Sequence, residues 1–240
     1  MKNRVISVGL MSSGGGEGSL RLFKSIVGLS NRQSIKIPFV FCNRDKGEYP
    51  KTDIFFSEVE KSGIPLIAIS SRKFKLSRNE IDEDGTNFGY EDRILKQLKK
   101  FDLDLILAVG YMLITSKIHK KFPMFNLHPA LPWGPKGTWK NVIRELIEQK
   151  ITETGLMIHR VTDELDSGTP ITISKFNIDV NSDKSHRDMT TNIRNAILER
   201  ESDFVCKTLE MISNGNINYN NPENSIDISD YLFNSSSSSS

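Results

Sequence analysis

The sequence has few cysteines and no long apolar run, which argues against an extracellular or membrane protein. Only two of its 240 residues are cysteines, Cys42 and Cys206. They lie too far apart for a C-x-x-C motif, so we expect a reducing compartment and no metal site. No apolar run reaches the roughly 18 residues that a membrane helix requires, and the N-terminal segment lacks a signal-peptide cleavage site. The expectation is a cytoplasmic protein with no membrane partner.

The chain also has almost no excess of positive over negative charge. The chain has 32 Lys and Arg residues against 30 Asp and Glu residues, a net charge of +2. Because no basic stripe stands out, the composition does not indicate a nucleic-acid partner. A chain of this length can bury a substantial core as one large domain. We expect a monomer or homodimer that acts on small molecules.

Short β-rich runs alternate with helical patterns over the first 110 residues. The expected strands are 4–10, 35–42, 64–70 and 103–110, and the helical patterns between them include 17–29, 53–63 and 90–101. Strands that are apolar on both faces and separated by helices predict an α/β fold. Its expected form is Rossmann-like, with a mostly parallel twisted sheet and helices on both faces. In such folds, ligands bind at the carboxyl ends of the strands.

The second half of the chain is expected to continue with fewer elements. A helix is predicted over 138–149, capped by Thr138, followed by strands 154–161 and 169–178 and by a long helix over about 184–213. The last segment is rich in Asn and Ser. We therefore predict one domain over residues 1–213 and a mostly disordered tail over 214–240.

The segment "FNLHP" holds the first candidate catalytic residues. Side chains alternate along a strand, so Asn126 and His128 point to the same side while Leu127 points into the core. An amide N–H beside an imidazole can serve as an oxyanion site next to an acid or base, as acyl or formyl transfer requires. Taken alone, this segment is more often a turn-capping Asn with a structural His.

The acidic segment "DELDSGTP" (163–170) changes that balance. A solvated acidic loop is its usual interpretation. Here Leu165 interrupts the charges, and a Gly and a Pro force a tight turn that can direct Asp166 inward. A carboxylate beside His128 would raise the pKa of the imidazole and orient its ring, which makes a proton relay.

Together the two segments resemble the folate-dependent formyltransferases, and among them the glycinamide ribonucleotide formyltransferases. In that family a strand ends in Asn-x-His-Pro with Leu-Pro shortly after, and a later loop reads Asp-Glu-Leu-Asp-x-Gly. The matching residues are Asn126, His128, Pro129, Leu131 and Pro132, and then Asp163, Glu164, Leu165, Asp166 and Gly168. The resemblance extends over roughly residues 4–210.

The resemblance implies a role for each matching position. Asn126 and His128 would stabilise the oxygen of the tetrahedral intermediate formed from 10-formyltetrahydrofolate, the co-substrate. Asp166 would keep His128 charged and help move a proton, and His159 would support the site. Further implied contacts are Met112 and Glu199 for the acceptor substrate, and Leu113, Ile114, Val161, Asp163 and Leu165 for the folate.

The Gly-rich segment "SSGGGEGSL" between the first strand and helix is a candidate phosphate site. Its glycines do not fit the spacing of a dinucleotide fingerprint. The family has Gly-x-Gly-Ser-Asn here, so the resemblance assigns the phosphate to Gly16, Gly18 and Ser19. Leu20 replaces the Asn, and Glu17 is an unfavourable neighbour for an anion unless it points away.

The expected function is transfer of a formyl group from 10-formyltetrahydrofolate to the primary amine of glycinamide ribonucleotide in purine biosynthesis. Two alternatives stay open. One is a formyltransferase acting on an amino sugar nucleotide, since Gly137-Thr138-Trp139 departs from the Gly-Leu-His common in purine-pathway members. The other is a catalytically silent nucleotide-binding module, against which the presence of Asn126, His128 and Asp166 argues.

Overall fold

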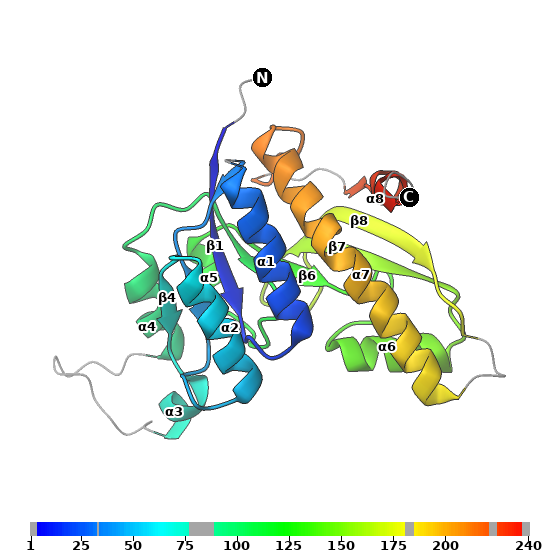
Figure 1. Cartoon of the computed structure of the whole chain (residues 1–240), viewed down its shortest axis with the longest axis horizontal. Coiled ribbons are helices and arrows are strands. Elements are labelled where there is room, and N and C mark those ends of the chain that lie inside the picture. Colours follow the sequence, from blue (N-terminus) through cyan, green and yellow to red (C-terminus); the bar gives the residue numbers. More distant parts are fainter. Residues whose placement is uncertain (1–3, 33, 77–88, 181–184, 221–224, 237–240) are drawn as a thin grey trace. The chain divides into compact units, whose positions relative to one another are not determined.

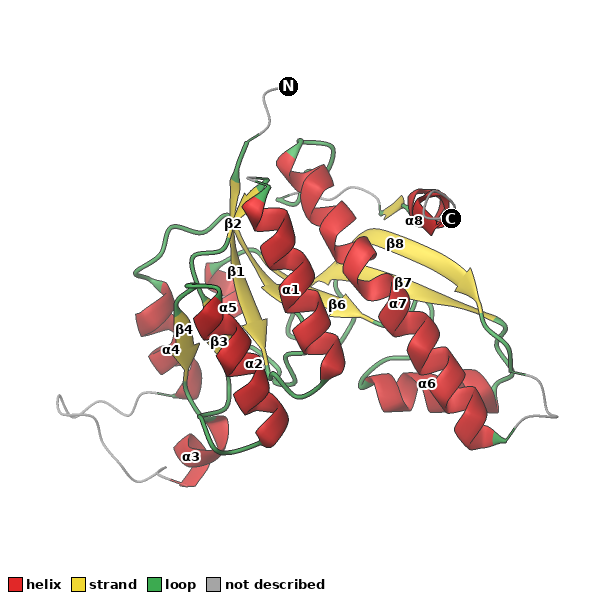
Figure 2. Cartoon of the chain, viewed as in Figure 1, coloured by secondary structure: helices red, strands yellow, loops and turns green. Residues whose placement is uncertain are grey.

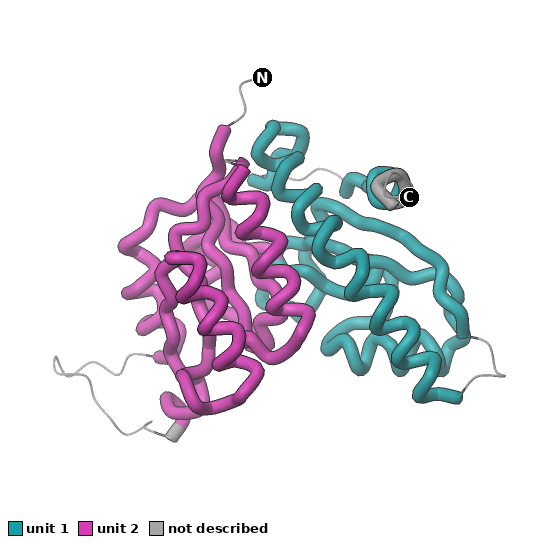
Figure 3. The backbone as a smooth tube through the Cα atoms, in the orientation of Figure 1, with its two compact units in different colours: residues 1–3, 126–240 teal, residues 4–125 magenta. Residues whose placement is uncertain are grey.

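The computed structural model describes residues 4–32, 34–76, 89–180, 185–220 and 225–236. The chain divides into two compact units (Figure 3). Residues 4–125 form one, here the N-terminal unit, and residues 126–240 with 1–3 form the other, the C-terminal unit.

The N-terminal unit alternates strands and helices (Figure 1). Its elements are β1 (Ile6–Ser12), α1 (Glu17–Asn31), β2 (Ile35–Lys36), β3 (Val40–Cys42), α2 (Pro50–Lys61), β4 (Leu66–Ala68), α3 (Ser71–Leu76), α4 (Tyr90–Leu98), β5 (Leu105–Ala108) and α5 (Ile118–Lys121). Strand β6 (Met124–His128) crosses into the C-terminal unit, which continues with α6 (Trp139–Glu148), β7 (Glu153–Arg160), β8 (Pro170–Asn177), α7 (His186–Ser213), β9 (Ile226–Asp227) and α8 (Ser229–Ser236).

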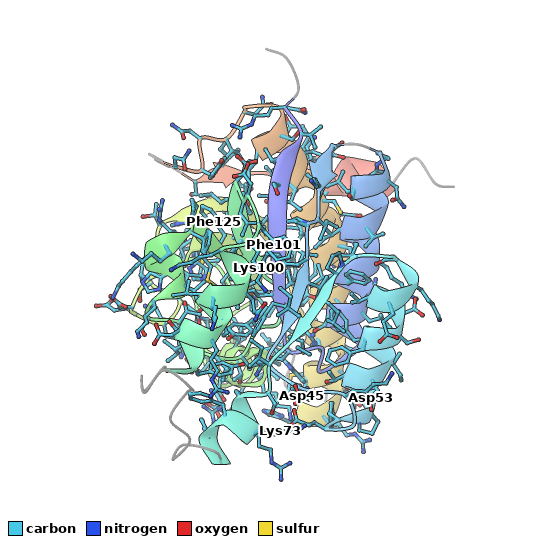
Figure 4. All side chains as sticks on the ribbon, turned by 90° about the vertical axis from the view of Figure 1, so that its left-hand side faces the viewer. Asp45, Asp53, Lys73, Lys100, Phe101 and Phe125 are labelled. Atoms are coloured by element: carbon cyan, nitrogen blue, oxygen red, sulfur yellow. The ribbon has the colours of Figure 1, made fainter. Side chains whose placement is uncertain are left out.

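The sheet of the N-terminal unit is parallel. Its order is β4-β3-β1-β5, and β2 also pairs with β1 in parallel. Strand β1 is buried along nearly its whole length, as expected of a strand covered on both faces. Helix α1 buries Leu22, Ile26 and Leu29, which recur at helical spacing and form one apolar stripe. Figure 4 shows helices on both sides of β1.

The C-terminal unit has the order β6-β7-β8-β9. Strands β7 and β8 form an antiparallel hairpin, with an irregularity in register between Ile158 and His159, and β9 joins β8 in parallel. Figure 2 shows the long helix α7 running across this part of the sheet. Side chains from the β6–α6 loop, β7 and β8 meet in a small buried cluster of Leu131, Met157 and Ile173.

The expected α/β fold with a mostly parallel sheet is confirmed. Most helices and strands begin and end within a few residues of the predicted positions. The predicted strand 35–42 is wrong as a single element, because it is divided into β2 and β3. Pro38 lies between them, and proline has no N–H for the hydrogen-bond ladder of a strand. The predicted helix 138–149 is present as α6, and the side chain of Thr138 caps it by accepting from the N–H of Asn141.

The tail after α7 differs from the expected disorder over part of its length. Residues 226–227 form β9 against β8, and α8 follows. Ile228 is fully buried, and its N–H donates to the carbonyl of Ile173. The Asn- and Ser-rich composition does not predict these elements, because the average composition of a segment does not show where its few apolar residues pack.

Candidate active site

The candidate catalytic residues come from β6 and from the turn between β7 and β8. On β6, Leu127 and His128 are buried while Asn126 is half-buried. The strand stops there because Pro129 cannot continue the hydrogen-bond ladder. The alternation that the sequence predicted for Asn126 and His128 thus places both side chains on the face that meets the β7–β8 turn.

Asp166 is turned inward within that turn, as predicted. It is 8% exposed, whereas its neighbour Leu165 is 53% exposed. Asp166 lies in the left-handed region with φ of 48°, a conformation that costs a residue with a side chain about 1 kcal/mol. Its contacts hold it there. The turn is also tight at Gly168, where a Cβ would come 1.7 Å from the carbonyl oxygen of Arg160.

The carboxylate of Asp166 lies at the centre of the cluster. Its Oδ2 is 3.4 Å from Nδ1 of His128 and accepts from the N–H of Gly137 at 2.8 Å. Its Oδ1 is 3.4 Å from Nε2 of His159 and 3.5 Å from Nδ2 of Asn126. The four sequence-predicted residues Asn126, His128, His159 and Asp166 therefore form one contiguous group, and the predicted proximity of Asp166 to His128 is confirmed.

Two backbone carbonyls determine which ring nitrogens carry protons. Nε2 of His128 is 2.9 Å from the carbonyl oxygen of Pro135, and Nδ1 of His159 is 3.0 Å from that of Arg160. A carbonyl only accepts, so each of these nitrogens is a donor. The remaining nitrogen of His128, Nδ1, faces Asp166. The remaining nitrogen of His159, Nε2, lies 3.3 Å from Nδ2 of Asn126 and orients that amide.

The charge states differ from the sequence-based expectation. Burial is the largest influence on His128 and lowers its pKa below the usual value, with His159 and Lys136 adding to it. Asp166 and the Pro135 carbonyl oppose this shift without overcoming it. Burial raises the pKa of Asp166, but contacts with His159, His128 and the Gly137 N–H together lower it. Asp166 thus raises the pKa of His128 as expected, but burial outweighs it, so the expectation that His128 is kept charged is wrong for the resting site. A neutral imidazole faces an ionised carboxylate.

The loop after β6 supplies contacts that the sequence did not reveal. Besides the carbonyl of Pro135 and the N–H of Gly137, Lys136 donates from Nζ to Oγ of Ser167 at 2.6 Å. Backbone groups have no residue signature, so only the position of this loop in the fold identifies two of these three contacts.

The Gly-rich loop of the N-terminal unit has the backbone of an anion site. Gly14 has φ of +57°, and a Cβ there would come 3.0 Å from the ring of Phe55. Gly16 precedes α1 and provides no side-chain cap. The N–H groups of the first helical turn, which includes Gly18 and Ser19, therefore keep the capacity to bind an anion. The side chain of Glu17 is exposed.

Arg44 also lies at this loop and was missed by sequence reasoning. A Cβ on Gly15 would come 3.1 Å from Nη1 of Arg44, and the same nitrogen donates to Oγ1 of Thr52 at 3.0 Å. The available signal was topological: Arg44 closely follows β3, and β3 pairs in parallel with β1. The carboxyl ends of adjacent parallel strands lie at one edge of a sheet.

The other implied contacts are more dispersed. Met112 and Ile114 are exposed, Leu113 is half-buried, and all three belong to the N-terminal unit. In the C-terminal unit Val161 is half-buried and Asp163 is exposed. The side chain of Glu199 is 68% exposed on α7 and lies 3.8 Å from Arg200, and its implied contact with the acceptor substrate stays a prediction.

The resemblance implies folate contacts at Asp163 and Leu165, and the main-chain groups of Glu164 between them already have partners within the turn. Oγ1 of Thr162 accepts from the N–H of Glu164 and donates to its carbonyl. In this turn the exposed side chain of Leu165 is therefore a clearer candidate for a folate contact than the main chain of Glu164.

Metal and membrane features can be judged over the ranges given above. Among those residues, no three His, Cys, Asp or Glu side chains come together in a way that could hold a metal ion. Within the same ranges, no helix has both the length and the apolar character to cross a membrane.

Comparison with known proteins identifies the family. The formyl transferase family pattern matches residues 21–205. Phosphoribosylglycinamide formyltransferase from Dictyostelium discoideum is 29% identical over 123 residues, which cover 47% of this chain and 58% of the relative. The Saccharomyces cerevisiae enzyme of the same name is 30% identical over 100 residues, 37% of this chain and 45% of the relative. The matched segments span about half the length of these curated relatives.

Solved structures show the same fold at low sequence identity. Glycinamide ribonucleotide transformylase 1 from Symbiobacterium toebii superposes with a TM-score of 0.68 at 17% identity, covering 89% of this chain and 90% of that one. A formyltetrahydrofolate deformylase from Pseudomonas syringae pv. tomato reaches 0.65 at 18% identity, covering 88% and 62%. Because the family pattern covers most of the sequence, the protein belongs to the formyl transferase family.

Proposed function

We propose that the protein transfers a formyl group from 10-formyltetrahydrofolate to the primary amine of glycinamide ribonucleotide, a step of purine biosynthesis. The observation that carries this proposal is the cluster of Asn126, His128 and Asp166, with contacts of 3.4 and 3.5 Å to the carboxylate. Family membership supports the reaction class, and the names of several relatives support the acceptor.

The first step is attack of the amine on the formyl carbon. A bond forms between nitrogen and carbon, and the carbonyl electron pair moves onto the formyl oxygen. Asn126 donates from Nδ2 to that oxygen, and this hydrogen bond strengthens as negative charge develops on the oxygen. The contacts of this amide to His159 and Asp166, at 3.3 and 3.5 Å, are long enough for one N–H to turn to the substrate.

The second step moves a proton from the attacking nitrogen to the departing folate nitrogen. Neutral His128 presents Nδ1 as the acceptor, because Nε2–H is engaged by the Pro135 carbonyl. Ionised Asp166 stabilises the imidazolium that forms. The proton then passes to the folate nitrogen as its bond to the formyl carbon breaks, which restores both resting charge states.

The glycine loop is proposed to bind the phosphate of the acceptor. The uncapped first turn of α1 offers backbone N–H groups and the positive end of a helix dipole. The guanidinium of Arg44 beside Gly15 adds a full positive charge, which suits a phosphate monoester. Arg44 can therefore make up for Leu20, which has no amide to donate.

The folate is proposed to contact exposed apolar side chains. In the N-terminal unit Ile114 is 70% exposed and Leu113 is half-buried, and in the C-terminal unit Leu165 is 53% exposed and Val161 is half-buried. Apolar side chains beside polar backbone suit a pterin ring, which has apolar faces and hydrogen-bonding edges. Met112, 57% exposed in the N-terminal unit, is assigned to the acceptor, and in the C-terminal unit Asp163 is assigned main-chain contacts to the folate.

The experiment incubates the protein with 10-formyltetrahydrofolate and a panel of primary amines and measures both donor loss and formyl-amine formation. The panel contains glycinamide ribonucleotide, its dephosphorylated riboside and an amino sugar nucleotide. We expect kcat/KM for the ribonucleotide to exceed that for the riboside by at least about tenfold, or 1.4 kcal/mol. A smaller ratio would mean that the glycine loop does not select a phosphate.

Arg44→Met sharpens this comparison, with Lys46→Met as a matched control. Both changes remove one positive charge from the segment after β3, but among the residues that the structure describes Lys46 approaches only Glu60, at 4.0 Å. We expect Arg44→Met to raise KM for the ribonucleotide by about tenfold or more, the value of a charge-assisted bond, and to leave the riboside unaffected. Donor loss without any formyl-amine product would instead indicate a hydrolase.

A further inference from the structure

Three consecutive residues of the β6–α6 loop contact the His128–Asp166 pair or the residue beside it. The carbonyl of Pro135 accepts from His128 at 2.9 Å, and the N–H of Gly137 donates to Asp166 at 2.8 Å. Lys136, between them, donates to Oγ of Ser167 at 2.6 Å. This loop therefore touches the imidazole on one side and the carboxylate turn on the other.

The position of the Asp166 carboxylate depends mainly on this loop. The bond from Gly137 is the shortest of its polar contacts, whereas Nδ1 of His128 remains at 3.4 Å. A charge-assisted N–H···O bond closes to about 2.7–2.9 Å, so the histidine contact alone is too loose to fix the carboxylate. A shift of residues 135–137 would move Asp166 relative to His128.

Lys136 is the side chain that joins the two loops. Ser167 follows Asp166 directly, and its hydroxyl donates to the carbonyl of Leu165 at 3.0 Å while it accepts from Lys136. The hydroxyl thus connects the ammonium group to the backbone on the other side of Asp166. Because Asp166 has a left-handed backbone, a conformation that needs support from its surroundings, this connection stabilises the turn where support is required.

We propose that Lys136 and Ser167 form a latch that positions Asp166 against His128 for formyl transfer. The inference rests on the proposed function, because it assigns the latch to the proton-transfer step. Lys136 is a positioning residue in this scheme: it acts on the reaction through Ser167 and Asp166 and touches neither substrate. Closing the latch holds Gly137 N–H on Oδ2, and opening it releases the carboxylate from its shortest bond.

The test compares Lys136→Met, Ser167→Ala and the double variant, with Lys140→Met as the control. Lys140 lies on the first turn of α6 near the ring of Trp139, so its loss changes the net charge equally without touching the Asp166 turn. We expect each latch variant to lower kcat by about five- to tenfold with KM within about twofold. The double variant should be no slower than either single variant, because both remove the same contact.

Two further measurements separate a latch from a loss of charge or of the whole function. Lys136→Arg should restore kcat to within about twofold of wild type, since it keeps a donor of similar reach. Hydrogen exchange of the Gly137 amide should become at least about fivefold faster in Lys136→Met and Ser167→Ala, and stay unchanged in Lys140→Met. This exchange measurement needs no substrate, so it tests the latch even if no amine in the panel accepts a formyl group.

Several outcomes would overturn the proposal. Single-variant effects that multiply in the double variant would show that Lys136 and Ser167 act independently. An unchanged kcat in Lys136→Met, or an unchanged Gly137 exchange rate, would show that the contact does not position Asp166. A different result would separate the two proposals: if wild-type protein transfers no formyl group but Gly137 exchange responds as expected, the proposed function fails and the contact of Lys136 with Ser167 is still shown to hold the loop.

Discussion

Replacing Asp166 by asparagine tests the electrostatic role of the cluster. The amide oxygen can keep the bond to the Gly137 N–H, the shortest contact at 2.8 Å, so the side chain need not move. The negative charge near Nδ1 of His128 is lost. For unit charges 3.4 Å apart, Coulomb's law at an effective dielectric constant of about 20 gives about 5 kcal/mol of stabilisation of the imidazolium.

Part of that stabilisation is recovered by the amide dipole and by water, so we expect Asp166→Asn to lower kcat by about a hundred- to a thousandfold, or 2.7–4.1 kcal/mol. Single-turnover formation of the formyl amine measures this directly. Glu164→Gln, an exposed acid in the same turn, is the control and should retain kcat within about twofold. Urea unfolding would verify that the variant is folded. A folded Asp166→Asn variant with kcat within about tenfold of wild type would refute the electrostatic argument.

Three other predictions follow from the geometry. In the proposed reaction neutral His128 accepts the proton, and burial lowers its pKa below 6.5. We therefore expect kcat/KM to fall only as pH drops below about 6.5. A pH–rate profile whose acid limb is centred above that value would contradict the assignment of His128 as the proton acceptor. Gly168→Ala should destabilise the protein by about 3 kcal/mol or more in urea unfolding, because its Cβ would meet the carbonyl of Arg160. Gly28→Ala, within α1 and with open space around it, should instead stabilise the protein by about 0.5–1 kcal/mol, and a loss of stability would show that α1 is packed differently.

The sequence carried enough information to predict which residues form the candidate site but not which contacts hold them in place. Period-2 alternation in "FNLHP" placed Asn126 and His128 on one side, and the interrupted acidic run predicted that Asp166 turns inward. Both predictions depend on local geometry, which short-range patterns encode. Pro135 contributes a carbonyl and Gly137 contributes an N–H, and because nearly every residue type has these backbone groups, the residue types alone do not indicate the contacts.

The charge state of His128 is a second property that the sequence did not predict correctly. From sequence, a nearby carboxylate suggested a raised pKa, because an opposite charge favours the protonated form. Burial works in the other direction and is larger here. Its size depends on how many atoms exclude water from the ring, which is a property of the whole fold. Glu199 shows the same dependence, since the family resemblance does not say how far its side chain is exposed, which is 68% on α7.

Proton positions link these observations to the reaction. Because Nε2 of His128 must donate to the Pro135 carbonyl, a neutral ring leaves Nδ1 without a proton, and Nδ1 faces an ionised Asp166. Two acceptors at 3.4 Å repel each other until a proton arrives between them. Proton uptake by Nδ1 would relieve this repulsion, and in the proposed reaction the attacking amine supplies that proton when its bond to the formyl carbon forms. The same arrangement would oppose a mechanism in which His128 begins as a charged donor, so in the proposed reaction the loop that fixes its tautomer would also determine the direction in which the proton moves first.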